Sequence, residues 1–174
     1  MGQRGVQGGH DIILVGGSSG SLVPLRAILA ALPSALPSAV FVVLHLARHQ
    51  RSPTVVIEGH SSLEVSIAED GEPFLPGRVY MAPGDRHRAL EDGKMRVFHG
   101  ARENGSRPAI DVLFRSAAVH HGARVAGVLL SGVLRDGSMG LSAVEERLRE
   151  LEEHAEAARG AIAAVSRPFD AEPS

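Results

Sequence analysis

A serine lies at the centre of a glycine-rich turn near the start of the chain. Residues 16–20 read GGSSG and fit the pattern G-x-S-x-G, with Ser18 in the middle. The aliphatic residues 12–15 precede this pattern and leucines at helical spacing follow it, so it predicts a sharp turn between a buried strand and a helix. Such a turn presents a serine nucleophile and leaves backbone N–H groups at the helix start for an oxyanion. The pentapeptide alone also fits a phosphate-binding turn or a plain turn.

The nucleotide-binding motifs are incomplete at this turn. A P-loop places a lysine directly after its last glycine, whereas Gly20 is followed by Ser21 and Leu22, and the one lysine of the chain is Lys94. The three-glycine dinucleotide motif has Ser18 where its second glycine belongs. The sequence therefore disfavours a nucleotide site and favours a reactive serine.

A serine hydroxyl at pH 7 needs a general base, and nine histidines compete for that role. His45 ends the aliphatic run 39–44, which predicts a buried strand, and open parallel sheets bind ligands at the carboxyl ends of their strands. His87 follows the turn at residues 81–85 and is the second choice. His45 and His49 also have the spacing of helical metal ligands, but His45 is expected in a strand, so we expect neither a metal site nor a cofactor.

The imidazole in turn needs a carboxylate to orient it, and Asp136 is the candidate. It follows the apolar run 125–131, which predicts another buried strand, and so belongs to the same carboxyl edge as Ser18 and His45. An Asp-Gly pair such as Asp136-Gly137 is also typical of a simple turn or a helix cap, and propensity alone favours that reading. The three side chains together would form a proton-relay triad.

The elements that must position these residues alternate between strands and helices. We expect buried strands at residues 11–17, 39–45 and 125–131, shorter strands at 63–67 and 78–81, and helices at about 21–31 and 108–119. Residues 86–90 and 95–99 flank an Asp-Gly turn and predict an antiparallel hairpin. The pattern predicts a three-layer α/β fold with a doubly wound, mainly parallel sheet and a small antiparallel hairpin.

The C-terminal part of the chain has a different pattern. Apolar residues recur at three-four spacing from residue 141 to residue 165 and form a heptad seam between Glu and Arg side chains. A last helix packed on the sheet and a helix that projects to pair with another helix both fit, so self-association through residues 141–165 stays open. We expect a flexible N-terminus at 1–10, an α/β domain at 11–142, a charged helix at 143–166 and a tail at 167–174.

Composition excludes several classes of function. The chain has no cysteine, so thiolate nucleophiles and sulfur-ligated metals are ruled out. Its 18 basic and 20 acidic residues give a net charge of -2, which argues against a nucleic-acid partner. The longest aliphatic-aromatic run, 39–44, is too short to span a membrane, and residues 1–10 contain no apolar signal segment. We expect a cytoplasmic protein without membrane insertion.

Several blocks of the sequence together resemble the catalytic domain of the chemotaxis protein-glutamate methylesterase (CheB) family. The resemblance covers roughly residues 11–142 in order and spacing. Its blocks are residues 15–20, 42–45, 68–72, 76–87, 107–118 and 131–141.

The resemblance implies a serine esterase that removes methyl groups from γ-glutamyl methyl esters on receptor helices, and that also deamidates glutamines. Ser18 would attack the ester, His45 would carry the proton, Asp136 would hold the imidazole, and the Ser19 backbone N–H would bind the oxyanion. The implied partners are methylated receptor helices and a receiver protein that acts in trans, since residues 1–10 cannot encode the family's receiver domain.

The chain departs from the family pattern near the oxyanion and at its C-terminal end. Ser21 stands where the family has a second glycine, and residues 132–134 read GVL where the family has Gly-Met-Gly. The heptad helix replaces the family's further glycine-rich and strand segments. An alternative function is therefore a binding module of the same fold that keeps receptor or partner affinity but has lost efficient chemistry.

Overall fold

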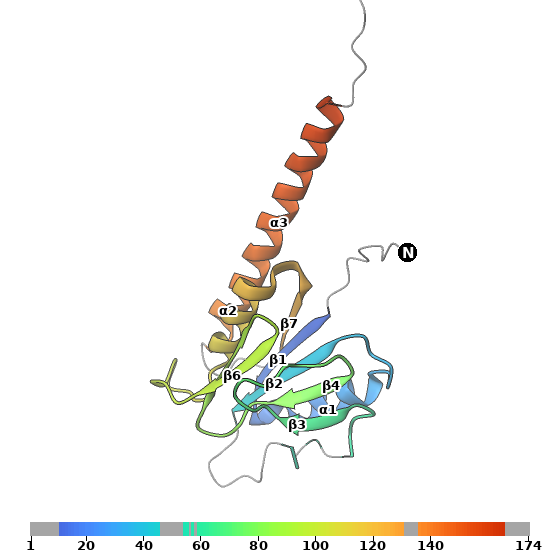
Figure 1. Cartoon of the computed structure of the whole chain (residues 1–174). Coiled ribbons are helices and arrows are strands. Elements are labelled where there is room, and N and C mark those ends of the chain that lie inside the picture. Colours follow the sequence, from blue (N-terminus) through green and yellow to red (C-terminus); the bar gives the residue numbers. More distant parts are fainter. Residues whose placement is uncertain (1–10, 46–53, 56, 58, 131–135, 166–174) are drawn as a thin grey trace, which may run out of the picture.

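A five-stranded parallel sheet forms the centre of the structure. The computed structural model describes residues 11–45, 54–55, 57, 59–130 and 136–165 of the 174-residue chain. All neighbouring strands of the sheet run parallel (Figure 1). In spatial order they are β3 (Glu64–Ile67), β4 (Arg78–Met81), β2 (Ala39–His45), β1 (Ile12–Ser18) and β7 (Val125–Leu129). The predicted α/β fold with a parallel sheet is confirmed.

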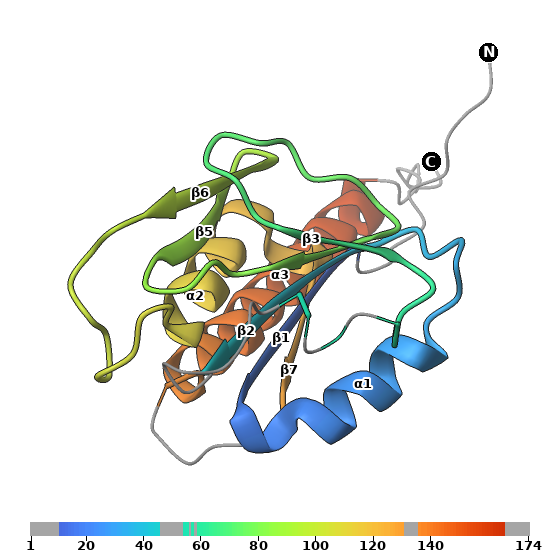
Figure 2. The same ribbon diagram turned by 90° about the horizontal axis from the view of Figure 1, so that it is seen from below.

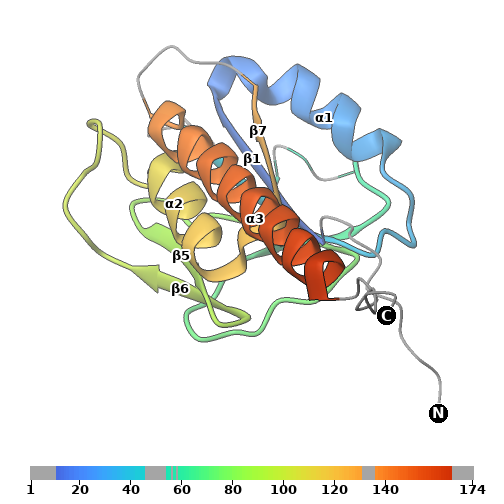
Figure 3. The ribbon, with the colours of Figure 1, turned by 90° about the horizontal axis from the view of Figure 1, so that it is seen from above.

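Helices cover both faces of this sheet, because side chains alternate between the two faces along each strand. Ile12 and Leu14 of β1 join an apolar cluster with Phe114 of α2 (Ile110–His121). Val15 belongs to a second cluster with Leu25 and other residues of α1 (Leu22–Ala31). Figures 2 and 3 show α1 on one side of the sheet and α2 on the other, with α3 (Ser138–Val165) beside α2. The three predicted layers are therefore present.

The sheet is doubly wound around β1. The chain moves from β1 through α1 to β2 on one side, and later returns to place β7 on the other side of β1. The helices that follow β1 and β7 lie on opposite faces of the sheet, with α1 on one face and α3 on the other. In such sheets this point of divergence, at the carboxyl ends of the strands, is where ligands bind. Ser18 is the last residue of β1 and stands at that point.

The predicted hairpin is also present. β5 (His87–Glu91) and β6 (Lys94–Phe98) pair antiparallel, each within one residue of its expected bounds. Asp92 and Gly93 join them with φ angles of 48° and 81°. A two-residue turn with both residues in the left-handed region matches the twist of the strands, which is why the Asp-Gly pair predicts it.

The C-terminal helix α3 spans Ser138–Val165 and begins five residues before the expected start at residue 143. Its first half packs on the domain, where Val144 is buried and Leu141 contacts the cluster around Phe114. Residues 152–159 are all exposed, and the second half projects away from the sheet (Figure 1). The helix thus packs on the domain with its first half and projects with its second half, while its pairing with another helix stays a prediction. Among the described residues, no helix is long and apolar enough to cross a membrane.

Candidate active site

Ser18 and His45 lie next to each other at the carboxyl ends of two adjacent strands. In the parallel pairing of β1 with β2, Ser18 is in register with His45. By the alternation along each strand, both share the face of Ile12, Leu14 and Phe41, which is the face that α2 and α3 cover. The sequence placed both residues at this edge, and the strand register sets them side by side.

Two glycines before Ser18 allow close packing around the turn. A Cβ atom at Gly16 would lie 2.5 Å from Cγ2 of Ile110, the first residue of α2. A Cβ atom at Gly17 would lie 2.5 Å from Oγ of Ser21, which is 1% exposed. Glycine is therefore required at both positions by contact with neighbouring elements. The start of α2 approaches β1 closely for this reason.

The structure brings Asp136 to the imidazole of His45. Oδ2 of Asp136 lies 2.9 Å from Nε2 of His45, and the two side chains are 0% and 19% exposed. The contact lies away from the direction of the ring N–H, since Nε2 makes no well-directed hydrogen bond among the described residues. The two groups are thus in close contact without a well-directed hydrogen bond, and they form an ion pair only when the imidazole is protonated. Because Nε2 faces the carboxylate, a proton from Ser18 would have to be taken by Nδ1, the other ring nitrogen.

The carboxylate of Asp136 is held from several sides. Oδ2 accepts the backbone N–H of Ile110 at 2.7 Å, and Oδ1 accepts the backbone N–H of Asp111 at 3.0 Å. Burial alone would raise the pKa of Asp136, but the contacts with His45, the two N–H groups and Asn104 outweigh it and lower the pKa below its usual value. These N–H groups open α2, so the helix dipole adds to the same effect. Asp136 is therefore ionised at neutral pH.

The sequence also allowed Asp136 to be a simple turn residue or a helix cap, and the helix-cap alternative is correct. Its carboxylate caps the start of α2, a helix that begins 26 residues earlier in the chain. The same side chain thus stabilises a helix and faces the imidazole. A cap and an orienting carboxylate are compatible because each oxygen can accept more than one hydrogen bond.

Ser19 begins the short 3-10 turn Ser19–Ser21 that leads into α1. Its backbone follows Ser18 directly at the start of a helical segment, where N–H groups lack intrahelical partners. Its role as the oxyanion donor stays a prediction. Residues 131–135, which hold the other departure from the family pattern, lie outside the described residues.

Both ring nitrogens of His87, the second choice as base, contact backbone groups. Its ring is buried, with Nε2 2.7 Å from the carbonyl oxygen of Ala101, while Nδ1 accepts the backbone N–H of Ala109 at 3.2 Å. The two contacts fix a neutral ring with its proton on Nε2. Neither nitrogen is left to accept a proton from a serine, so His45 is the better candidate.

Two site residues were missed from the sequence. Asn104 and Asp111 both contact the surroundings of Asp136: Nδ2 of Asn104 donates to Oδ2 of Asp111 at 2.8 Å and to Oδ1 of Asp136 at 3.4 Å. Asp111 lies in the first turn of α2, where an acidic residue is favoured by the helix dipole alone, so its type gave no sign of a second contact. The dipeptide Asn104-Gly105 is a turn signal, and nothing local connects it to a residue 32 positions away.

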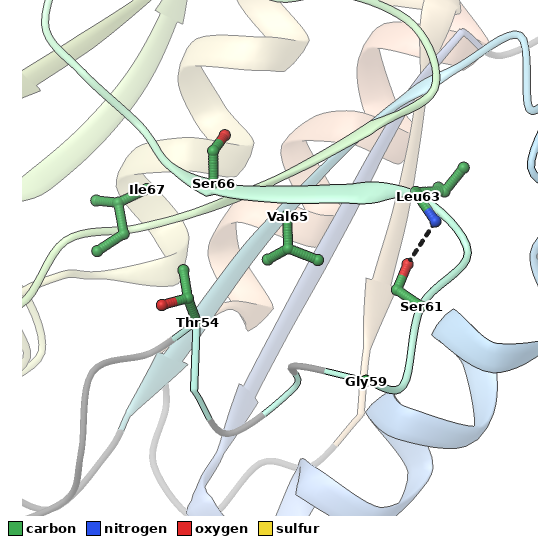
Figure 4. Close-up of a pocket in the computed structure, with 7 residues that line it drawn as sticks. All are labelled: Thr54, Gly59, Ser61, Leu63, Val65, Ser66 and Ile67. Atoms are coloured by element: carbon green, nitrogen blue, oxygen red, sulfur yellow. Dashed lines mark hydrogen bonds between the residues drawn. The ribbon is translucent and has the colours of Figure 1, made fainter.

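A separate pocket of about 500 Å³ lies against the edge strand β3 (Figure 4). Ser18, His45 and Asp136 do not line it, and Val65 and Ser66 point to opposite sides of the strand there. Among the described residues, its lining contains hydroxyl and aliphatic groups without a titratable side chain, so we assign it no catalytic role. The lining residues are Thr54, Gly59, Ser61, Leu63, Val65, Ser66 and Ile67.

The fold and these side chains define an α/β domain with a hydroxyl, an imidazole and a carboxylate at the carboxyl edge of a parallel sheet. The chain belongs to the CheB methylesterase family, whose model matches residues 13–150. The crystal structure of the Thermotoga maritima CheB methylesterase catalytic domain is similar, with a TM-score of 0.73 and 30% sequence identity; the match covers 79% of this chain and 76% of that chain.

The chain is also similar to curated proteins that are named protein-glutamate methylesterase/protein-glutamine glutaminase. A protein-glutamate methylesterase/protein-glutamine glutaminase of Yersinia pestis is 38% identical over 137 residues, which are 76% of this chain and 39% of the relative. Protein-glutamate methylesterase/protein-glutamine glutaminase 1 of Cupriavidus metallidurans is 40% identical over 142 residues, which are 79% of this chain and 40% of the relative. The chain thus spans about two fifths of the length of these relatives.

Proposed function

We propose that this chain is a serine esterase that hydrolyses γ-glutamyl methyl esters on chemotaxis receptors to glutamate and methanol. The observation that carries the proposal is the 2.9 Å approach of Asp136 to His45, whose strand position is in register with Ser18. Hydroxyl, imidazole and carboxylate in this order are the groups that acyl transfer by a serine requires. The names of the relatives support both methylesterase and glutaminase activity, so glutamine side-chain amides are the second proposed substrate.

In the proposed mechanism, Ser18 Oγ attacks the ester carbonyl while Nδ1 of His45 takes the hydroxyl proton. Asp136 stabilises the resulting imidazolium through its contact with Nε2, and it stays ionised because its pKa is lowered. The backbone N–H of Ser19 binds the oxyanion of the tetrahedral intermediate. The imidazolium then protonates the departing methoxide, which leaves as methanol. Water activated by the same imidazole hydrolyses the acyl-enzyme and regenerates Ser18.

The proposed partners follow from this substrate. Methylated receptor helices present the ester, and a receiver protein acting in trans is the proposed regulator. Receptor signalling helices lie in the cytoplasm, so we place the reaction there. The exposed half of α3 is proposed to pair with the same helix of a second copy.

The test is methanol release from a methylated chemotaxis receptor by the purified chain. Ser18→Ala should lower turnover by about four to six orders of magnitude, whereas the matched variant Ser142→Ala, at an exposed position of α3, should leave it unchanged. Methanol release that persists in Ser18→Ala would reject the assignment. Receptor binding without methanol release, and without labelling of Ser18 by an organophosphonate, would instead support the binding-module alternative.

A further inference from the structure

Asp136 and Asp111 are two buried carboxylates, and each accepts hydrogen bonds from backbone N–H groups at a helix start. For Asp136 this is the start of α2, which contains Asp111; for Asp111 it is the start of α3, which Asp136 precedes. Asp136 accepts the N–H groups of Ile110 and Asp111, which open α2. Asp111 Oδ1 in turn accepts the N–H groups of Gly137 at 2.9 Å and Gly140 at 2.7 Å, at the start of α3. Both residues are nearly inaccessible to solvent, with Asp111 1% and Asp136 2% exposed. The position of one carboxylate therefore depends on the position of the other.

Like charges at close range repel, so this pair needs donors between its members. Asn104 provides one, because its Nδ2 reaches Asp111 at 2.8 Å and Asp136 at 3.4 Å. The amide is neutral, so it stabilises both carboxylates without competing with His45 as a counter-charge for Asp136. Asn104 itself is exposed, and so it covers the pair from the solvent side.

The backbone conformation of the turn at residues 103–106 fixes the position of Asn104. Its φ angle is 51°, in the left-handed region that asparagine tolerates better than most residues. Glu103 and Ser106 close the turn around it with two backbone hydrogen bonds of 3.1 and 2.8 Å. Glu103 also forms a 2.6 Å ion pair with Arg115 of α2. The turn is therefore fastened to the same helix whose start Asp136 caps.

We infer that Asn104 is a positioning residue, which acts through Asp111 and Asp136 to hold the carboxylate that faces His45. The inference rests on the proposed function, in which that carboxylate orients the general base. Asn104 contacts neither the serine nor the ester in this scheme. Among the described residues, the titratable groups around it are Asp111, Asp136 and, beyond Asp136, His45, with the Glu103–Arg115 pair on its own turn and α2.

Two substitutions separate positioning from folding. Asn104→Gly removes the amide but suits the positive φ, so the turn keeps its conformation. Asn104→Asp keeps the shape and places a third carboxyl beside two carboxylates, whose charges raise the pKa of the introduced group. Asp92→Gly is the matched control, because Asp92 has a φ of 48° in the distant, exposed β5–β6 turn. Thermal unfolding of each variant establishes that it is folded at the assay temperature.

The first readout is the rate at which a fluorophosphonate labels Ser18, a step in which Ser18 Oγ bonds to phosphorus, fluoride leaves and His45 takes the proton. Asn104→Gly should label about tenfold more slowly, since water replaces only part of the lost hydrogen bonding. Asn104→Asp should be labelled near the wild-type rate while the introduced carboxyl is protonated, and more slowly at pH values where it is ionised. Wild type and Asp92→Gly should not show this decrease in labelling rate. Equal labelling rates and pH profiles in all four proteins would overturn the inference.

The second readout does not depend on catalysis. In Asn104→Asp, the carboxyl carbon at position 104 is followed by NMR against pH, together with the ring signals of His45. We expect the His45 signals to change with the midpoint of the introduced carboxyl, because the ionisation reaches the ring through Asp136. If the His45 ring signals do not change as the introduced carboxyl ionises, the inference is overturned. Absence of any Ser18 labelling in wild type would count against the proposed function alone, since the NMR result still decides the role of Asn104.

Discussion

Ser18 and His45 occupy the same register position at the ends of two adjacent parallel strands. Their proximity therefore depends on the backbone pairing of β1 with β2, seven residue pairs long, and not on a flexible loop. Asp136 is held differently, since its position depends on hydrogen bonds to the start of α2. The site thus joins a rigid sheet edge to two helix starts, and each of these supports can be disturbed separately.

Removal of the charge at Asp136 should affect catalysis far more than binding. Asp136→Asn keeps the size of the side chain but replaces the oxygen acceptors on one side with a donor, so the imidazole loses its orientation and its counter-charge. We expect kcat for methyl ester hydrolysis to fall by about 10⁴-fold with little change in KM. Asp92→Asn, at an exposed turn position, serves as the control. A fall of less than tenfold in Asp136→Asn would show that another group supports the base.

The same carboxylate should contribute to stability in a pH-dependent way. The pKa of Asp136 is lowered in the folded protein, so the unfolded state binds the proton more readily. Its contribution is fully present above the unfolded pKa of about 4 and is lost as the pH falls through the folded value. Urea unfolding of wild type and Asp136→Asn between pH 3 and 7 should show a stability difference that is constant above pH 5 and shrinks below pH 4. A difference that grows toward acid pH would contradict this.

A methyl group at Gly16 should push α2 away from the sheet. The new Cβ would lie 2.5 Å from Ile110, whose backbone N–H binds Asp136. We expect Gly16→Ala to lower the free energy of unfolding by about 1–3 kcal/mol and to reduce esterase activity as well. Gly84→Ala is the matched control, because a Cβ there meets nothing within 4 Å. Denaturant unfolding and methanol release measure both effects, and equal values for the two variants would refute the steric argument.

Arg88 should destabilise the fold, because its guanidinium is fully buried without a carboxylate partner among the described residues. It donates to the carbonyl oxygens of Tyr80 at 2.6 Å and Val42 at 3.3 Å, while its Nε has no partner in this part of the chain. Burial lowers the pKa of Arg88 to about 9. The guanidinium also lies over the ring of Phe41, 5.1 Å from its centroid. Charge burial of this kind is still costly, and we expect an apolar side chain of similar length to be tolerated at this position.

We therefore expect Arg88→Met to raise the free energy of unfolding at pH 7 by about 1–2 kcal/mol. The folded pKa lies below the unfolded one, so the wild-type penalty is fully present below about pH 9 and is relieved as the pH rises further. The advantage of Arg88→Met should accordingly shrink in alkaline solution. Arg96→Met, at an exposed position of β6, is the control. Lower stability of Arg88→Met at pH 7 would show that the two carbonyl contacts and the contact with the Phe41 ring together outweigh the desolvation of the charge.

The sequence predicted the elements better than their contacts. Aliphatic runs ending at Ser18 and His45 identified two central strands, and the rule that ligands gather at carboxyl edges placed Asp136 near them. Local patterns could not assign His87, because its two partners, Ala101 and Ala109, come from a distant loop. Asn104 was missed for the same reason. The early start of α3 at Ser138 depends on N–H groups that bind Asp111, 26 residues earlier, which no local propensity reports.

The exposed half of α3 should pair with a second copy of itself. Leu151 contacts Gly122 of its own domain, but the seam continues through Ala155 and Ala158, which are exposed. An antiparallel arrangement would place these alanines against each other and would set Glu152 of one copy beside Arg159 of the other, two exposed residues of opposite charge. The overlap is short, so the association should be weak. Sedimentation at increasing concentration should therefore show a rising sedimentation coefficient.

Substitutions on two sides of the helix test this pairing. Ala155→Glu introduces a charge into the seam and should give a monomer at every concentration, whereas Ala157→Glu changes the same residue type off the seam and should behave as wild type. Both positions are exposed, so neither change should alter the stability of the domain. If wild type sediments as a monomer at all concentrations, or if both variants associate equally, the seam serves no self-pairing and its projecting half is left for a different helical partner.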